Sequence, residues 1–201
     1  GLIRPICHND LDRVVRLHAD YMDDSVFVRL GERFLYHLYQ GTISSSQGIG
    51  YVYVEDEQVM GFITATTHTT RLFKEILLKE GYRLIPLILS QIFKNPGVTG
   101  NIFQTFFYFN RVALRSVKAE LLFISIEPHQ RGRGIARELI GTVLSDMRRR
   151  EIPKVKVTTV KNNIVVNQLL KNLGFHLERS FNLYGKVMQL YSYNLEAQGI
   201  R

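Results

Sequence analysis

The chain has 201 residues, of which 45% are hydrophobic and 22% charged, a balance typical of a folded globular protein and not of a disordered one. Cys7 is the only cysteine, which excludes an intramolecular disulfide and a cysteine-rich zinc site and favours a reducing, cytoplasmic location. Lysine and arginine outnumber aspartate and glutamate by 26 to 18, and the resulting net charge of +8 favours anionic partners.

No segment of the sequence predicts a membrane span or a secretion signal. The longest apolar run, residues 84–89, is interrupted by Pro86 and falls far short of the roughly 20 apolar residues that a spanning helix needs. The first residues lack the basic, apolar and small-residue regions of a signal peptide. We therefore expect neither a transmembrane helix nor a cleaved leader.

The first third of the chain predicts alternating strands and helices. A short strand is expected over residues 2–6. Apolar residues at helical spacing predict a helix directly after it and a second helix over 28–39. Two further strands, 51–55 and 59–66, are expected to form a hairpin through the polar residues between them.

Residues 70–118 differ from the rest in composition. They contain eight lysines or arginines, only two acidic residues and eight aromatic residues. Their apolar spacing predicts two helices separated at Gly81, followed by a third apolar segment over 103–112. Three interpretations remain open for this insertion: an extra helical layer, a lid or acceptor pocket, or a helix that makes peripheral contact with an anionic membrane surface.

The last part of the chain again alternates strands and helices. A loop over 127–134 separates the first strand from the first helix. The expected elements are a strand over 121–126, a helix over 135–150, a strand over 155–160, a helix over 163–173 and a final hairpin of strands over 175–183 and 187–195. Because no linker or internal repeat is present, we expect a single domain over 1–201.

The segment QRGRGIA, residues 130–136, lies between a predicted strand and a predicted helix. Glycines at such a turn let backbone amides approach a ligand, and the start of a helix attracts negative charge. The segment therefore predicts an anion-binding loop. No Gly-Lys-Ser/Thr follows it, as a Walker loop would require, and Arg137 stands where the dinucleotide fingerprint has its third glycine.

This loop resembles the pyrophosphate loop of the GNAT superfamily of acyl-CoA-dependent N-acyltransferases. The family pattern Arg/Gln-x-x-Gly-x-Gly/Ala is matched by Arg131, Gly134 and Ala136. The resemblance continues through Asn163, at the start of the next helix, to the Leu-Gly-Phe sequence at 173–175. It is good over residues 120–175 and holds in outline over 1–68, whereas the insertion lies outside it.

The resemblance implies an α/β fold of the GNAT type. Its central sheet would be mixed but largely antiparallel and flanked by helices, with the helical insertion between the third and fourth strands. It also implies acetyl-CoA as cosubstrate; no metal is expected, on the separate ground of the histidine spacing given below. The residues implied to contact it are Ile124, Ser125 and Ile126 at the pantetheine arm and thioester, Arg131, Gly132, Arg133, Gly134, Ile135 and Ala136 at the pyrophosphate, and Asn163 and Asn167 on the next helix.

The implied reaction needs a neutral amine, and only about one in a thousand lysine-like amines is neutral at pH 7. A general base is therefore useful. Glu120 is the first candidate, because the histone-acetyltransferase branch of the family has a base glutamate at the matching place; the alternative is a solvated glutamate at the end of a strand. Glu127 and His129 are weaker candidates, since they lie beside the loop.

The residue at the position of the family's general acid departs from the family pattern. Many members have a tyrosine before the Leu-Gly-Phe sequence that protonates the leaving thiolate, and here that position is Leu170. Tyr184, in the final hairpin, is the candidate substitute; the alternative is a buried aromatic residue at a turn. The departure also keeps open a non-catalytic acyl-CoA-binding module.

The remaining motifs predict little chemistry. The six histidines show no paired spacing typical of a metal site. The arginines at 148–150 end a predicted helix, where cations complement the dipole, so we expect no nucleic-acid partner. The function expected is acetyl transfer to the primary amine of a small molecule, such as an amino sugar or a nucleotide-linked amine. The alternative acceptor is a protein lysine or N-terminus.

Overall fold

The computed structural model of the chain describes residues 1–22, 26–95, 116–183 and 185–196. The predicted segment 103–112 and Tyr184 lie outside these residues. In chain order the elements are β1 (Leu2–Pro5), η1 (His8–Asp10), α1 (Leu11–Tyr21), α2 (Val26–Arg29), α3 (Glu32–Ile43), β2 (Gly48–Glu55), β3 (Gln58–Thr66), α4 (Thr69–Lys94), β4 (Ala119–Ile126), η3 (Pro128–Gln130), α6 (Ile135–Arg149), β5 (Lys154–Val160), α7 (Ile164–Asn172), β6 (His176–Leu183) and β7 (Lys186–Asn194).

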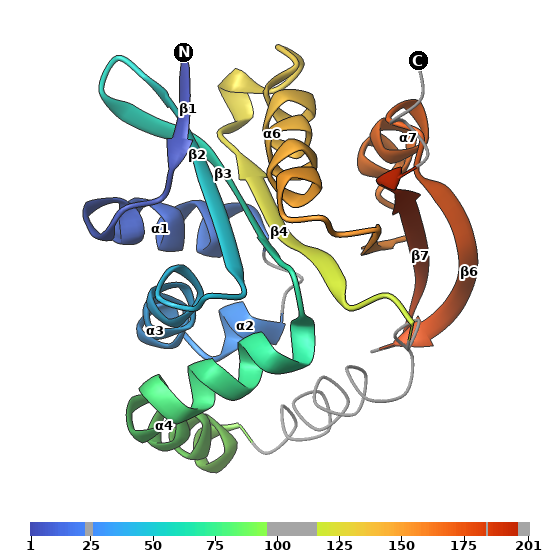
Figure 1. Ribbon diagram of the computed structural model, residues 1–201. Helices are drawn as coiled ribbons and strands as arrows, with labels where there is room; N and C mark the ends of the chain where they lie inside the picture. The colour runs from blue at the N-terminus through green and yellow to red at the C-terminus, as the bar shows by residue number, and fades with distance from the viewer. Residues whose placement is uncertain (23–25, 96–115, 184, 197–201) are drawn as a thin grey trace.

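The strands form one seven-stranded sheet in the order β1-β2-β3-β4-β5-β7-β6 (Figure 1). Every neighbouring pair is antiparallel except β4 and β5, which are parallel and are connected through α6. The predicted fold class is confirmed: a mixed, largely antiparallel sheet flanked by helices, with α4 between the third and fourth strands.

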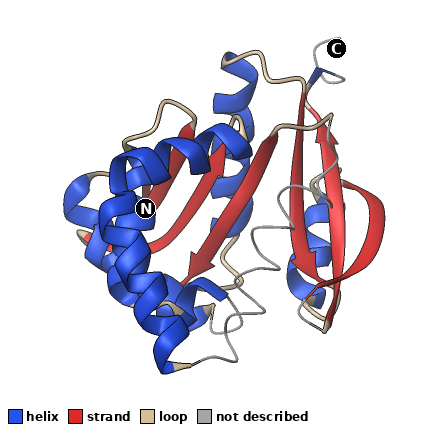
Figure 2. Ribbon diagram, turned by 90° about the horizontal axis from the view of Figure 1, so that it is seen from below, coloured by secondary structure: helices blue, strands red, loops and turns tan. Residues whose placement is uncertain are grey.

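Helices cover both faces of the sheet, and each face has its own apolar core. One core lies beneath α6 and α7 and includes Leu139 and Leu170. The other lies beneath α1, α3 and α4 and includes Leu17, Leu35 and Leu72. Figure 2 shows the strands spread between these helical layers and separating into two diverging groups. This divergence matters for the site described below.

The single helix predicted over 28–39 is wrong. The chain forms two helices there, α2 and α3, with Gly31 between them at φ +92°. An L-residue with a side chain rarely adopts this left-handed conformation, whereas glycine does so at little cost. The chain therefore changes direction at Gly31, and α3 begins as a separate helix that still packs against α2, where the rings of Phe27 and Phe34 stack with centroids 6.0 Å apart.

The predicted break at Gly81 is also wrong. Helix α4 runs without interruption from Thr69 to Lys94 and contains both Gly81 and Pro86. A glycine inside a helix costs only about 1 kcal/mol, and burial of Leu72, Ile76 and Leu84 against the core stabilises the helix on both sides of it. None of the described helices is long and apolar enough to cross a membrane.

Candidate active site

The parallel strands β4 and β5 pair only at their first residues. The register joins Ala119 to Val155, Glu120 to Lys156 and Leu121 to Val157, and no further pair is formed in the described parts of these strands. The pairing ends beside an irregularity in β4, where the register with β3 shifts between Thr64 and Ala65. Beyond that point the two strands separate, and none of the strands that the structure describes lies beside this edge of β4.

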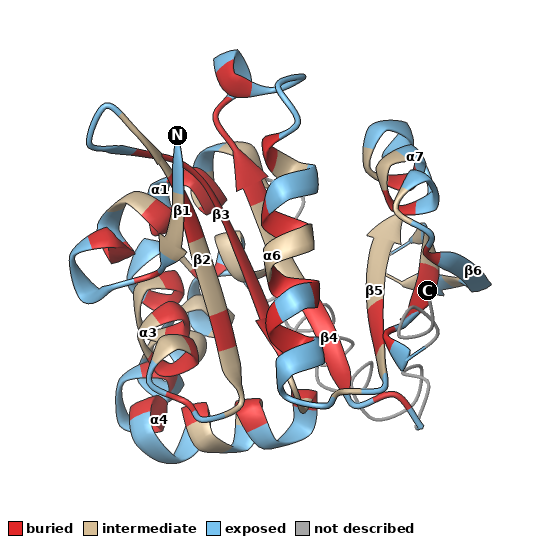
Figure 3. Cartoon of the chain, turned by 45° about the horizontal axis from the view of Figure 1, so that its top comes forward, coloured by how far each residue is buried: buried red, intermediate tan, exposed pale blue. Residues whose placement is uncertain are grey.

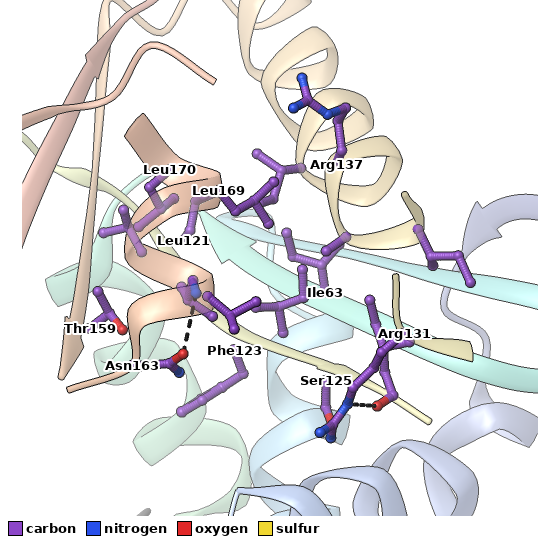
Figure 4. Close-up of a pocket in the computed structure, with 18 of the residues that line it drawn as sticks. Ile63, Leu121, Phe123, Ser125, Arg131, Arg137, Thr159, Asn163, Leu169 and Leu170 are labelled. Atoms are coloured by element: carbon purple, nitrogen blue, oxygen red, sulfur yellow. Dashed lines mark hydrogen bonds between the residues drawn. The ribbon is translucent and has the colours of Figure 1, made fainter. Parts of the chain in front are cut away.

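A cavity of about 570 Å³ lies where the strands separate (Figure 4). In the close-up, Thr159 and Asn163 lie on one side of it and Ser125 and Arg131 on the other. Its described lining is contributed by the end of α1, by β3, β4 and β5, by the loop before α6 and by the helices α6 and α7. Of the predicted cofactor residues, the lining includes Ile124, Ser125, Ile126, Arg131, Gly132, Gly134, Ile135, Ala136 and Asn163.

The loop before α6 lines this cavity and leads into a helix whose first backbone amides lack helical partners. Gly132 and Gly134 have φ values of +81° and +86°, and Gly134 is the N-cap of α6. The first backbone hydrogen bond of the helix runs from Glu138 to the Gly134 carbonyl (3.1 Å), so the amides before Glu138 have no partner within the helix. A Cβ atom added to either glycine meets nothing within 4 Å. Open space at the two glycines, next to amides without helical partners, suits an anion.

The two arginines of the loop differ in what they bind. Nε of Arg131 donates to the Ile126 carbonyl (3.1 Å), and its guanidinium lies 5.5 Å from the ring centroid of Tyr21. Arg131 therefore connects the end of β4 to the end of α1. Arg133 instead binds both carboxylate oxygens of Glu55 (2.7 and 2.8 Å), which fastens the loop to the β2–β3 hairpin. It is not among the described residues that line the cavity.

Glu127 anchors α1 to the end of β4. Its carboxylate accepts a hydrogen bond from the Tyr21 hydroxyl (2.9 Å), forms an ion pair with Arg13 and lies 3.7 Å from Nδ1 of His129. Burial raises the pKa of Glu127, but the hydrogen bonds from Tyr21 and Arg13 outweigh burial and hold that pKa below its usual value. A carboxylate held in this way orients Tyr21, which lines the cavity.

Glu120 is buried, which contradicts the alternative of a solvated glutamate. Only 5% of it is exposed, its carboxylate accepts a hydrogen bond from Thr69 (2.8 Å), and Nζ of Lys156 lies 3.8 Å away. Burial raises the pKa of Glu120, and the Lys156 ammonium opposes that rise. Its neighbours in β4, Ala119 and Leu121, belong to the core beneath α6, so alternation directs Glu120 to the opposite face. It is not among the described lining residues.

The two predicted asparagines of α7 have different surroundings. Asn163 caps the helix by accepting from the Val166 amide (3.2 Å), and it lines the cavity. Asn167 is 6% exposed and is not a lining residue; its Nδ2 donates to the carbonyls of Val160, Lys161 and Asn163, and its Oδ1 accepts from a tyrosine hydroxyl. Its side chain therefore connects α7 to β5 and β7.

Leu170 also lines the cavity and is 1% exposed, so the position that holds a tyrosine in many GNAT proteins is apolar and closely packed here.

The lining also contains Tyr21, Met22 and Arg137, which the sequence did not predict. Arg137 lies in the first turn of α6, directly after the loop, and only this position in the sequence could have predicted it as a lining residue. No group of three His, Cys, Asp or Glu side chains that could hold a metal ion is present among the described residues.

Comparisons with known proteins agree on one family. A model of the acetyltransferase (GNAT) family matches residues 14–175. Similar solved structures include an N-acetyltransferase from Staphylococcus aureus Mu50 (TM-score 0.63, 14% identity, covering 96% of this chain and 98% of that one). Another is Arabidopsis thaliana NAA60 in complex with acetyl-CoA (TM-score 0.61, 17% identity, covering 97% and 98%). At these identities the likeness shows the fold alone. No curated protein matches the sequence.

Proposed function

The chain belongs to the acetyltransferase (GNAT) family, and on this premise we propose that it transfers an acetyl group from acetyl-CoA to the primary amine of a small molecule. The observation that carries the proposal is the cavity between β4 and β5, which is bordered at one end by the amides before Glu138. A diphosphate carries the charge that such a helix start favours, by about 0.3 to 2 kcal/mol.

The unpaired edge of β4 supports the placement of the pantetheine arm. Beyond Leu121, no strand among the described residues pairs with β4 on its β5 side, and buried backbone groups need hydrogen-bond partners. The pantetheine arm contains two amide groups and can pair with Ile124 and Ile126 as an added strand would. The thioester would then lie between the strands, and the diphosphate would reach the loop at 131–136.

The proposed chemistry is direct attack. The amine nitrogen forms a bond to the thioester carbonyl carbon, the carbon–sulfur bond breaks, and coenzyme A leaves with its sulfur electron pair. The amine gives up one proton and the sulfur gains one. Because the ammonium form cannot attack, and reaching the neutral form at pH 7 costs a lysine-like amine about 4 to 5 kcal/mol, a base contributes to the rate.

We assign the role of general base to Glu120 and the role of general acid to Tyr184. Burial supports the first assignment, since a raised pKa brings a carboxylate closer to the operating pH. Glu120 need not line the cofactor cavity, because an amine can approach the thioester from the opposite face of the sheet. Tyr184 lies outside the described residues, and its assignment depends only on its position between β6 and β7.

The acceptor is proposed to be a small anionic amine, such as an amino sugar or a nucleotide-linked amine. The net charge of +8 and the basic composition of the insertion support an anionic acceptor. The second candidate is a protein N-terminus, since the similar structures include a ribosomal-protein-alanine N-acetyltransferase from Brucella melitensis (TM-score 0.59). That likeness is one of fold, and a basic insertion suits an acidic small molecule better than a basic peptide.

The test is release of free thiol from acetyl-CoA in the presence of candidate acceptors. The panel contains amino sugars, nucleotide-linked amino sugars, polyamines and peptides with free N-termini, and each product is identified by mass. We expect turnover with an anionic amine. Turnover with peptides alone would overturn the acceptor class, and tight acetyl-CoA binding with no turnover on any acceptor would favour a non-catalytic module.

A further inference from the structure

Helix α4 has large apolar side chains on the face that points away from the core. Leu78, Tyr82, Ile85, Leu89 and Phe93 are 75%, 68%, 47%, 49% and 84% exposed. Their spacing of four, three, four and four residues places them in one row along the helix. We call these five residues the outer stripe. Figure 3 shows exposed positions along the outward side of α4.

The outer stripe is additional to the ordinary buried face of α4. Leu72, Ile76 and Leu84 already pack into the core beneath α1, α3 and α4. A surface helix normally has one apolar face and one polar face. A continuous exposed apolar row opposite the buried one is typical of an interaction surface.

Basic residues accompany the outer stripe. Arg71 and Lys74 precede it on the same side of the helix, and Lys94 follows Phe93 at the end of α4. Lys79 lies beside the stripe with its ammonium donating to the Ser44 carbonyl (2.9 Å); all four are exposed. The acidic residues of α4 are held elsewhere: Glu75 accepts from Ser45 (2.6 Å), and Glu80, 8% exposed, binds Arg83 and lies 3.2 Å from His37. The partner that complements this face is therefore apolar and negatively charged.

We propose that the outer stripe docks α4 onto the surface of an anionic phospholipid membrane. From Leu78 to Phe93 the row is about 22 Å long at 1.5 Å per residue, and it lies on a convex helix rather than in a groove. A convex row of this kind does not require a complementary pocket in a partner protein, and it can insert among lipid head groups. Leucine, isoleucine, tyrosine and phenylalanine enter the acyl boundary, while lysine and arginine bind the lipid phosphates.

This docking leaves the cofactor loop accessible. The amide and hydroxyl of Thr69 bind the Lys118 carbonyl (2.9 and 3.1 Å), which fastens the start of α4 beside the start of β4. The loop at 131–136 follows the other end of β4, and Figure 1 shows α4 and the start of α6 at opposite ends of the sheet. A membrane in contact with α4 therefore leaves coenzyme A free to exchange with water.

The test is cosedimentation of the full chain with vesicles. One set contains phosphatidylglycerol and phosphatidylcholine in equal parts, and the other contains phosphatidylcholine alone. We expect binding to the anionic vesicles that weakens as salt is added. The variant Leu78→Gln/Ile85→Gln/Leu89→Gln should bind at least about tenfold more weakly, since burial of each apolar side chain contributes to the affinity. The variant Arg71→Gln/Lys74→Gln/Lys94→Gln should lose most of the preference for anionic vesicles.

A matched control replaces exposed apolar residues outside α4. The variant Leu2→Gln/Leu177→Gln changes positions that are 61% and 46% exposed on β1 and β6, and it should bind vesicles as the wild type does. Calorimetry with acetyl-CoA separates this proposal from the proposed function, because the α4 variants should keep wild-type affinity. The proposal is overturned if the wild type does not bind anionic vesicles, if the variant Leu78→Gln/Ile85→Gln/Leu89→Gln binds them as well as the control variant does, or if the wild type is a dimer that this outer-stripe variant dissociates.

Discussion

The hydroxyl of Thr69 donates a hydrogen bond to the carboxylate of Glu120 (2.8 Å). The first residue of α4 is thereby joined to the second residue of β4, the strand that borders the cavity. Lys156, the register partner of Glu120 on β5, is only 3% exposed. The start of the insertion and the point where β4 and β5 still pair are thus connected through one buried carboxylate.

Removal of that carboxylate should destabilise the protein. In Glu120→Ala the ammonium of Lys156 remains buried without its counter-charge, and we expect the free energy of unfolding to fall by about 3 to 5 kcal/mol. The double variant Glu120→Ala/Lys156→Met should recover most of this loss, because no buried charge remains. Urea unfolding measures both. Equal losses in the single and double variants would show that the charge pair does not explain the effect.

The proposed base role of Glu120 has a separate test in Glu120→Gln. A general base must be deprotonated, so kcat/KM of the wild type should fall as the pH drops through the pKa of Glu120, which burial raises above its usual value. In Glu120→Gln the rate should be lower by about 10²- to 10⁴-fold, and this acidic fall should be absent. A variant that stays folded and keeps the wild-type pH profile would exclude Glu120 as the base.

Gly134 should be required for binding of acetyl-CoA. Gly134→Ala adds a Cβ at φ +86°, which costs about 1 to 2 kcal/mol in backbone strain, and it places a methyl group in the space proposed for the diphosphate. We expect the Kd to rise by about tenfold or more, the equivalent of one lost charge-assisted hydrogen bond. Calorimetry measures this affinity.

The matched control for Gly134→Ala is Gly141→Ala in the same helix. A Cβ added at Gly141 also meets nothing within 4 Å, but Gly141 lies inside α6 and has no positive φ. This change should raise the free energy of unfolding by about 0.5 to 1 kcal/mol through helix propensity and leave the Kd unchanged. If both substitutions affect binding alike, the loss cannot be attributed to the loop.

The arginines near the loop should contribute unequally. Arg133 is bound to Glu55, whereas Arg137 lines the cavity. Arg137→Gln should weaken acetyl-CoA binding by about 1 kcal/mol, or about fivefold in Kd, because an exposed ionic contact is worth little more. Arg133→Gln should change the Kd by less than this. The opposite order would mean that Arg133 leaves Glu55 to bind phosphate.

The parts of the site that could be predicted are local in sequence. The loop before α6 lies between an apolar strand and an apolar helix, and its glycines are adjacent to the helix they cap, so a short window contained everything needed. Tyr21, in contrast, reaches Glu127 across 106 positions, and Arg13 does so across 114. No pattern within a single element indicates which strand end an α1 side chain will meet.

The two glycine predictions differ for a physical reason. Gly31 and Gly81 both stand within helical patterns. At Gly31 the chain adopts φ +92°, which ends the helix. Gly81 is flanked by Ile76 and Leu84, which are buried in the core beneath α4, and their packing outweighs the intrinsic cost of glycine. Tertiary contacts therefore decide whether the helix ends or continues at a glycine, and the spacing of apolar residues in the sequence does not show these contacts.

Asn167 should prove to be a structural residue. Its Nδ2 lies 2.7 to 3.1 Å from three backbone carbonyls, and its Oδ1 accepts from Tyr191 (2.9 Å). Asn167→Ala leaves these buried groups unpaired, and we expect the free energy of unfolding to fall by about 1 to 3 kcal/mol. Asn163→Ala changes a residue that lines the cavity. A rise in the Kd for acetyl-CoA in Asn167→Ala larger than in Asn163→Ala would assign Asn167 to the cofactor instead.

His18 should make the protein less stable in mild acid. Its ring is completely buried, shares a hydrogen bond with Tyr39 through Nδ1, and has no partner for Nε2 among the described residues. Burial lowers the pKa of His18 to about 4, from 6.5 in an unfolded chain. The unfolded state therefore binds a proton first as the pH falls, so stability is lost below pH 6.5 and the loss is complete near pH 4. Between pH 7 and pH 5 it amounts to about 2 kcal/mol. In His18→Phe the urea-unfolding free energy should lose about 2 kcal/mol less over this interval than in the wild type, and an identical loss in both proteins would show that other groups cause it.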